Sequence, residues 1–222
     1  MKTFTRIRLG VLVVTSLTWS TAFILRAETL TIATYNIENY TQADRTTEGV
    51  YRRDYPKPEA DKAALRKVIH ELNADVLALQ EIGGRPYLLE LQRDLKTEGL
   101  AYEYSVVMEG ADAARMTAVL SKRAFVKTTQ HADLTFKYFD GVEKVRRGLL
   151  EVSVPRAAGE AVGVFVVHLK SRYTERSDDP GAALQRAGEA VAVRDRILKV
   201  YPEPATGCFL ILGDFNDGRT SR

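Results

Sequence analysis

Polar side chains stand at the ends of four apolar, strand-like runs in this sequence. The first run ends in Asn36, the second in Glu81, a later one in His168, and the last in Asp214 and Asn216. Strand ends in helix-covered sheets converge on one crevice, so these side chains are expected to form a single site. Two carboxylates there could act as the acid/base pair of a glycosidase, but that reaction leaves the amides and the histidine without roles.

The elements that must position these residues follow from the hydrophobic pattern. Leu65 and Ile69 recur at helical spacing, Asn73 is a typical helix stop, and the pair Asp140-Gly141 predicts a hairpin. The pattern predicts helices over 58–73, 88–99 and 180–201, and strands over 29–40, 75–82, 102–109, 117–125, 137–154, 163–171 and 207–216. On the third helix, five residues are expected roughly on one side: Leu184, Ala187, Val191, Ile197 and Leu198. Helices separate some strands and hairpins join others, which indicates an α/β chain of mixed sheets covered by helices.

The first 27 residues have the character of a secretory signal peptide. Lys2, Arg6 and Arg8 precede an almost uncharged run over 9–25, and Ala27 is a small residue at a plausible cleavage point. Cleavage after residue 22 and an uncleaved membrane anchor are the alternatives. We therefore expect one domain over residues 28–222, secreted or periplasmic, without stable membrane insertion once the leader is cleaved.

Removal of the predicted leader changes the charge balance. The whole chain carries 32 basic and 29 acidic residues, a net charge of +3, and four of the basic residues lie in the leader. The remaining domain is close to neutral, so any polyanion must be bound through a local patch or a metal ion. Cys208 is the single cysteine, which excludes an internal disulfide.

Five segments together resemble the endonuclease/exonuclease/phosphatase superfamily, the deoxyribonuclease-I-like proteins. They are TYNIEN, ADVLALQEI, RRGLLEV, VVHLKS and ILGDFND, and they follow the family's order from about Thr29 to the last residue. The resemblance implies a four-layer αββα sandwich, in which two mixed β-sheets are flanked by helices. It also implies Mg²⁺-dependent hydrolysis of phosphate esters, with Mn²⁺ or Ca²⁺ as alternative ions.

The resemblance implies roles for the first three strand-end residues. Glu81 matches the family's metal-binding carboxylate, and Asn36 matches the asparagine that assists the metal. A hard cation with few protein ligands is typical of Mg²⁺, which keeps several waters and meets the substrate phosphate. His168 matches the histidine that contacts the scissile phosphate, a catalytic role.

The last strand end and a nearby arginine complete the implied site. Asp214 and Asn216 match the catalytic pair beside the attacking water and the phosphate. Their spacing of two on an extended chain puts both side chains on one face, so both can contact one substrate atom. Arg147 is the candidate clamp for the substrate phosphate, because a guanidinium can contact two phosphate oxygens, and Arg146 or Arg115 could serve instead.

The sequence departs from the family pattern at its end. Family members continue past GDFN with further strands and a terminal Asp-His pair, whereas no histidine follows His168 here. The resemblance therefore implies that the C-terminal part of the domain is missing. We expect either a fragment of a longer gene product or a shortened homologue with little turnover.

The function implied is that of an exported, Mg²⁺-dependent phosphodiesterase, a nuclease in the first instance. The alternatives are a phosphatase or sphingomyelinase-like phosphodiesterase of the same superfamily, and a non-catalytic homologue that binds metal or a polyanion. The expected partner is nucleic acid or another phosphodiester substrate, and the expected state is a monomer. The segment 41–58 is a candidate nucleic-acid patch, with a solvated loop as the alternative, because three arginines are interleaved with two tyrosines: Arg45, Arg52 and Arg53 with Tyr51 and Tyr55.

Overall fold

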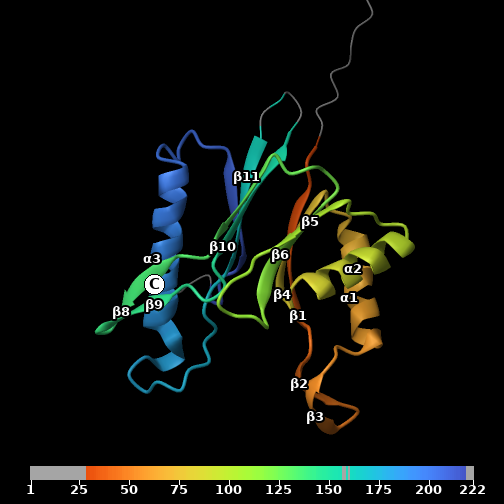
Figure 1. Cartoon of the computed structure of the whole chain (residues 1–222), viewed down its shortest axis with the longest axis horizontal. Helices are drawn as coiled ribbons and strands as arrows, with labels where there is room; N and C mark the ends of the chain where they lie inside the picture. Colours follow the sequence, from red (N-terminus) through yellow and green to blue (C-terminus); the bar gives the residue numbers. More distant parts are fainter. Residues whose placement is uncertain (1–28, 157–158, 160, 219–222) are drawn as a thin grey trace, which may run out of the picture.

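The computed structural model of the chain describes residues 29–156, 159 and 161–218 (Figure 1). The predicted signal peptide, residues 1–27, lies outside the described residues. Within the described part of the chain, no helix has the length and apolar character needed to span a membrane.

The first sheet contains the strands that carry Asn36 and Glu81. Its order is β1 (Ile32–Tyr40), β4 (Val76–Ile82), β6 (Met116–Ser121) and β5 (Tyr104–Val107). β1 and β4 are parallel, so their carboxyl ends meet at one edge, and the other neighbours are antiparallel. The outer face, on the right in Figure 1, is covered by α1 (Glu59–Leu72) and α2 (Arg85–Thr97).

The second sheet contains the strands that carry His168 and Asp214. Its order is β12 (Phe209–Asp214), β11 (Ala161–His168), β10 (Leu149–Pro155) and β7 (Lys127–His131). β11 and β12 are parallel and place His168 beside Asp214 in register. A 3₁₀ turn, Pro180–Ala182, leads into α3 (Ala183–Val200), which covers the outer face on the left in Figure 1.

Two hairpins project from the body of the molecule, one at the left and one at the bottom of Figure 1. One joins β8 (Thr135–Tyr138) to β9 (Gly141–Lys144) and confirms the turn predicted at Asp140. The other joins β2 (Ala43–Thr47) to β3 (Val50–Tyr55). It lies within the segment 41–58, for which the sequence allowed either a nucleic-acid patch or a solvated loop. Its turn contains Gly49 with a φ of +79°, a conformation that favours glycine.

Successive residues of β4 show how the layers are held together. Val76 and Ala78 pack between the two sheets, whereas Leu77 and Leu79 pack under α1 and α2. A strand buried on both faces is a continuous apolar run rather than an alternating one. A third apolar cluster, which includes Phe165, lies between the second sheet and α3. Three apolar interfaces between four layers confirm the predicted αββα sandwich.

The buried face of α3 differs from the predicted one. Of the five residues expected on one side, Ile197 is buried, whereas Leu184, Ala187, Val191 and Leu198 are exposed. The interior positions besides Ile197 are Arg186, Glu189 and Val193. The prediction was wrong for the four exposed residues, because two charged side chains occupy interior positions, where backbone groups satisfy their hydrogen bonds.

Candidate active site

The amide of Asn36 joins the two sheets at the centre of the candidate site. Its Nδ2 donates a hydrogen bond to Glu81 Oε1 at 3.3 Å and another to Asp214 Oδ2 at 2.9 Å. Its Oδ1 accepts from the N–H of Glu38 at 2.9 Å. The structure therefore brings three of the predicted strand-end residues into direct contact, with Asn36 as the shared donor.

The backbone around Glu81 departs from regular strand geometry. Glu81 has a φ of +66°, and Asn39 has a φ of +51°. The pairing of β1 with β4 shifts register between Asn36 and Tyr40, as at a β-bulge. The bulge brings the N–H of Asn39 to 2.9 Å from Glu81 Oε2, which fixes the second oxygen of the carboxylate. Bulges at strand ends commonly redirect a side chain toward a functional site.

His168 lies beneath the two carboxylates. It is only 2% exposed, and its Nε2 lies 3.8 Å from Glu81 Oε1 and 4.0 Å from Asp214 Oδ2. Burial lowers the pKa of His168, and the charge of Arg147 lowers that pKa further, although the nearby carboxylates act in the opposite direction. The imidazole is therefore neutral near pH 7 and can donate one hydrogen bond.

The carbonyl oxygen of Leu169 connects the remaining predicted residues. It accepts from Asn216 Nδ2 at 2.9 Å and from Arg147 Nη1 at 3.4 Å. The N–H of Asn216 in turn donates to Asp214 Oδ1 at 2.8 Å. Asp214 is thus held through both oxygens, by Asn36 on one side and by Asn216 on the other.

The three candidate arginines lie in different environments. Arg147 is buried and donates from Nε to Asp112 Oδ2 at 3.0 Å, so the structure places it beside His168 with a fixed side chain. Arg115 donates to Oδ1 of Asn39 at 2.8 Å, and Asn39 is the residue whose N–H binds Glu81. The side chain of Arg146 is exposed. Sequence reasoning missed Asp112 and Asn39, because a loop aspartate and an asparagine near the end of a strand are too common to signal a site.

The donor set at the site fits a hard cation with few protein ligands. Glu81 and Asp214 offer carboxylate oxygens that are partly exposed, at 17% and 30% of the side-chain surface. Among the described residues, no group of three or more Asp, Glu, His or Cys side chains is arranged so that it could hold a metal ion by itself. Asn36 turns its nitrogen, not its oxygen, toward the carboxylates, so the oxygens available to a cation at this point are those of Glu81 and Asp214. Mg²⁺ typically binds through one or two carboxylates and keeps several waters.

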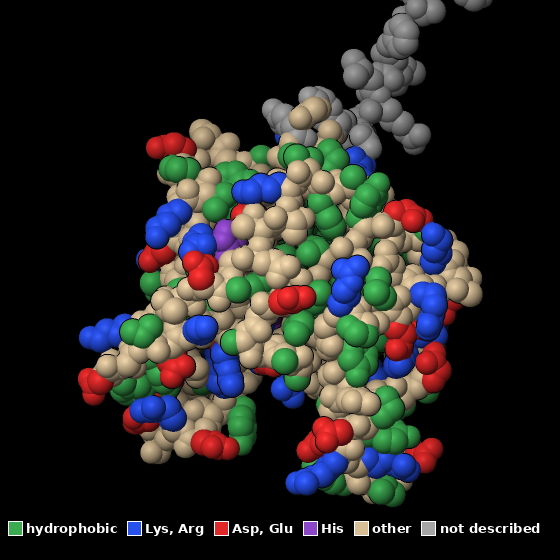
Figure 2. All heavy atoms as spheres, in the orientation of Figure 1, with side chains coloured by type: hydrophobic (Ala, Val, Ile, Leu, Met, Phe, Trp, Pro, Cys, Tyr) green, Lys and Arg blue, Asp and Glu red, His purple; other side chains and the backbone are tan. Residues whose placement is uncertain are grey.

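The surface around the site is notched and carries basic side chains. Figure 2 shows a notch between two lobes, one that contains the β8–β9 hairpin and the segment leading into α3, and one formed by the β2–β3 hairpin, with Lys and Arg side chains on both sides. Arg52 stacks on Tyr55 at 4.9 Å and Arg176 on Phe139 at 4.4 Å. Arg45, in contrast, donates to the backbone oxygens of Asn39, Thr41 and Tyr55, which gives it a structural role within the predicted patch.

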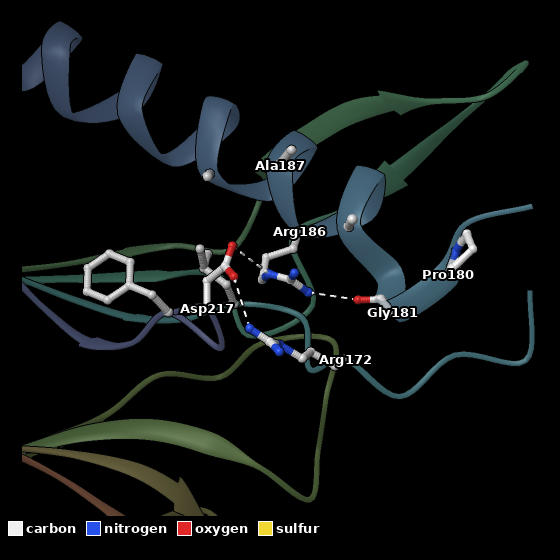
Figure 3. A pocket seen from close by; sticks show the side chains of 10 residues that line it. Arg172, Pro180, Gly181, Arg186, Ala187 and Asp217 are labelled. Carbon is white, nitrogen blue, oxygen red and sulfur yellow. Dashed lines mark hydrogen bonds and ion pairs between the residues drawn. The ribbon is translucent and has the colours of Figure 1, made fainter. Parts of the chain in front are cut away.

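A cavity of about 500 Å³ lies next to the site, between α3 and the end of β12. Leu169 and Phe215 line it, and these residues directly follow His168 and Asp214 in the chain. Figure 3 shows Asp217 between two arginines of this cavity, at 3.3 Å from Arg172 and 3.4 Å from Arg186.

The sequence model of the Endonuclease/Exonuclease/phosphatase family matches residues 33–222. The catalytic domain of human Nocturnin with a bound sulfate anion is similar in structure, with a TM-score of 0.60 at 16% identity over 86% of this chain and 65% of that one. A beta toxin of Staphylococcus aureus has a TM-score of 0.59 at 19% identity over 87% of this chain and 68% of its own. A mutant of the same toxin with bound magnesium ions has a TM-score of 0.51 at 22% identity over 72% and 58%.

These comparisons establish the fold, and the chain spans only part of each of the three proteins, at most 68%. No curated protein sequence matches the chain.

Proposed function

The chain belongs to the Endonuclease/Exonuclease/phosphatase family, a family of metal-dependent phosphoric ester hydrolases, and on that premise we propose that it hydrolyses phosphodiester bonds with Mg²⁺. The observation that carries the proposal is the pair of hydrogen bonds from Asn36 to Glu81 and Asp214. They hold two carboxylates from separate sheets at one point, beside a neutral histidine. That set of groups suits phosphate chemistry better than sugar chemistry, because every predicted residue then has a role.

The residues of this chain divide the work between the cation, the phosphate and the water. Glu81 would hold the cation, with Asn36 beside it, and a bound Mg²⁺ would neutralise charge on the phosphate. The neutral His168 donates from Nε2 toward a phosphate oxygen. Asp214 faces the same point and is the acceptor available for a proton of the attacking water.

We propose nucleic acid as the substrate class because of the surface around the site. The β2–β3 hairpin and the segment before α3 each carry an arginine stacked on an aromatic ring, an arrangement that can contact backbone phosphates and bases. Because the domain without its leader is close to neutral, this local surface and the cation must supply the attraction. Export through the predicted signal peptide and a monomeric state complete the proposal.

The test compares metal binding and hydrolysis in three proteins. Mn²⁺ affinity is measured by water-proton relaxation. Hydrolysis is measured with bis(p-nitrophenyl) phosphate and with plasmid DNA as substrates, in the presence of Mg²⁺. We expect Glu81→Gln to weaken Mn²⁺ binding by about tenfold or more and to abolish any hydrolysis. Glu103→Gln, which removes an exposed carboxylate paired with Lys96, is the control and should match the wild type. Equal Mn²⁺ affinity in the wild type and Glu81→Gln would exclude the proposed site.

A further inference from the structure

A buried carboxylate of α3 lies behind the candidate active site. Glu189 is fully buried, with 0% exposure, on the face of α3 that packs on the second sheet. Its Oε1 accepts from the N–H of Arg146 at 3.3 Å, and its Oε2 accepts from the N–H of Lys170 at 2.6 Å. One side chain therefore holds the residue before Arg147 and the residue two positions after His168.

The backbone of Lys170 is held by α3 on both sides of its Cα atom. Glu189 binds its N–H, and Arg186, one turn earlier on α3, lies with Nη1 3.5 Å from its carbonyl oxygen. Figure 3 shows that Arg186 is itself fixed by Gly181 and Asp217. Two interior charges of the same helix thus anchor the chain just beyond β11.

The anchored segment sets the position of the groups at the site. Leu169, between His168 and Lys170, donates its N–H to the backbone oxygen of Asp214 at 2.9 Å. Its carbonyl is the acceptor shared by Asn216 and Arg147. A displacement of this peptide would therefore be transmitted to His168 and to the partners of Leu169.

The segment before Arg147 is held just as tightly. The backbone of Arg146 donates to Glu189 and accepts from the N–H of Asp112 at 3.0 Å. The chain at Gly110 packs so closely here that a Cβ atom would lie 3.0 Å from the carbonyl oxygen of Arg146. The residue before Arg147 is therefore hydrogen-bonded to α3 through its N–H and to the 110–112 segment through its carbonyl oxygen.

Packing alone does not account for an acid at position 189. Burial raises the pKa of Glu189, while the two backbone N–H groups and the charges of Arg147 and Lys170 act in the opposite direction. Burying a carboxylate is unfavourable, and an apolar side chain of similar size commonly serves as well or better where only packing is needed. The two backbone hydrogen bonds are what an apolar side chain would not provide.

We propose that Glu189 is a positioning residue that fixes His168 and Arg147 in the arrangement that receives a phosphate group. The proposal rests on the proposed function, because the phosphate is the ligand of that site. Glu189 contacts neither the cation nor the substrate in this arrangement. It acts through the peptides of Arg146 and Lys170.

The experiment uses the full chain and the variants Glu189→Gln and Glu189→Ala. Asp195→Asn is the matched control, because Asp195 is a carboxylate of the same helix that is exposed and paired with Arg194. Four quantities are measured: Mn²⁺ affinity, kcat and KM for bis(p-nitrophenyl) phosphate, the thermal unfolding midpoint, and exchange of the Arg147 Nε–H by NMR. The last is independent of activity, because this N–H is bonded to Asp112 and not to Glu189.

We expect a graded loss in the two variants. Glu189→Gln keeps one acceptor oxygen, so kcat should fall about tenfold. Glu189→Ala keeps none, so kcat should fall about 100-fold. In both variants, KM and Mn²⁺ affinity should stay within twofold of the wild type. Exchange of the Arg147 Nε–H should accelerate at least tenfold in Glu189→Ala and remain unchanged in Asp195→Asn. A merely structural role would instead lower the unfolding midpoint and reduce Mn²⁺ affinity and kcat together.

Failure of this proposal is distinguishable from failure of the proposed function. If the wild type neither hydrolyses the reporter nor binds Mn²⁺ through Glu81, the proposed function fails, and the exchange of the Arg147 Nε–H alone decides whether Glu189 positions the site. The proposal would be overturned if folded Glu189→Ala had the same Arg147 Nε–H exchange rate and the same kcat as the wild type. Loss of folding in both variants would assign Glu189 to stability and would overturn it as well.

Discussion

Asn36 and Asp214, 178 positions apart, are joined by a 2.9 Å hydrogen bond that links the two sheets. The donor is the amide nitrogen of Asn36, and its second acceptor is Glu81. One neutral donor thus lies between two carboxylates that would otherwise repel each other. The cation that we propose at this point would relieve the same repulsion.

Replacement of Asn36 by aspartate should make the fold depend on divalent cations. In EDTA, three adjacent carboxylates should lower stability by roughly 1–2 kcal/mol, or about 3–6 °C in the unfolding midpoint. Addition of Mn²⁺ should raise the midpoint of Asn36→Asp more than that of the wild type, because the new carboxylate adds a ligand. Asn36→Ala is the control and should be destabilised without a larger response to Mn²⁺. An equal response in all three proteins would contradict the proposed cation position.

Removal of Asp112, the ion-pair partner of Arg147, should lower the free energy of unfolding. Arg147 and Asp112 form an ion pair with side chains only 7% and 13% exposed. Asp112→Ala leaves the guanidinium without its carboxylate, and breaking a buried pair costs about 3 kcal/mol or more. Chemical denaturation measures the change. The exposed pair of Arg176 with Asp178 provides the control, because Asp178→Ala should leave the free energy of unfolding within error.

Tyr102 should contribute to loss of stability in alkaline solution. Its side chain is 2% exposed, its hydroxyl has no hydrogen-bond partner among the described residues, and burial raises its pKa to about 12. The unfolded chain releases the tyrosine proton near pH 10, before the folded chain does. Stability is therefore unaffected below pH 10 and falls as the pH rises toward 12, by up to roughly 3 kcal/mol.

The variant Tyr102→Phe isolates this effect. The difference in unfolding free energy between the wild type and Tyr102→Phe should grow in favour of the variant between pH 10 and 12. At pH 7 the variant should be at least as stable, because the hydroxyl that it removes is buried without a partner. Tyr173→Phe, at a 73% exposed position, is the control. A pH-independent difference for Tyr102→Phe would refute the assignment.

The edge of the second sheet should promote self-association. Among the described residues, β12 pairs only with β11, and its Leu210 and Ile211 are 46% and 42% exposed. An unpaired apolar edge strand is a template for pairing with another chain. Ile211→Lys should reduce light scattering at high protein concentration and leave Mn²⁺ affinity unchanged. The corresponding change at an exposed helix position, Leu89→Lys, should have a much smaller effect on scattering.

The strands and their polar ends could be predicted because the pattern there is local. The apolar run of β4 is bounded by Asp75 and Glu81, and the run of β11 ends directly in His168. The spacing of α1 and its stop at Asn73 were also correct, since Asn73 has the left-handed conformation of a helix C-cap. Such elements depend on few contacts from elsewhere in the chain.

The contacts that join the elements could not be predicted in the same way. The exposure of Leu184 and the burial of Glu189 reverse the usual assignment of apolar and charged residues on α3. The arginine-tyrosine segment was ambiguous because Arg45 donates to the backbone oxygen of Tyr55, which lies close to it only in the folded hairpin. Asp112 is linked to Arg147 across 35 positions, a pairing that no local pattern signals.

The left-handed backbone at the strand ends bears on how this protein can be engineered. Besides Glu81 and Asn39, Glu38 and Asn216 have positive φ values, of +47° and +52°. Each such residue outside glycine costs of order 1 kcal/mol, so glycine at these positions would relieve strain in the folded chain. A screen that ranks variants by melting temperature alone would therefore select glycine substitutions at the residues that form the site. Libraries for this protein should keep these four positions fixed and place their diversity elsewhere.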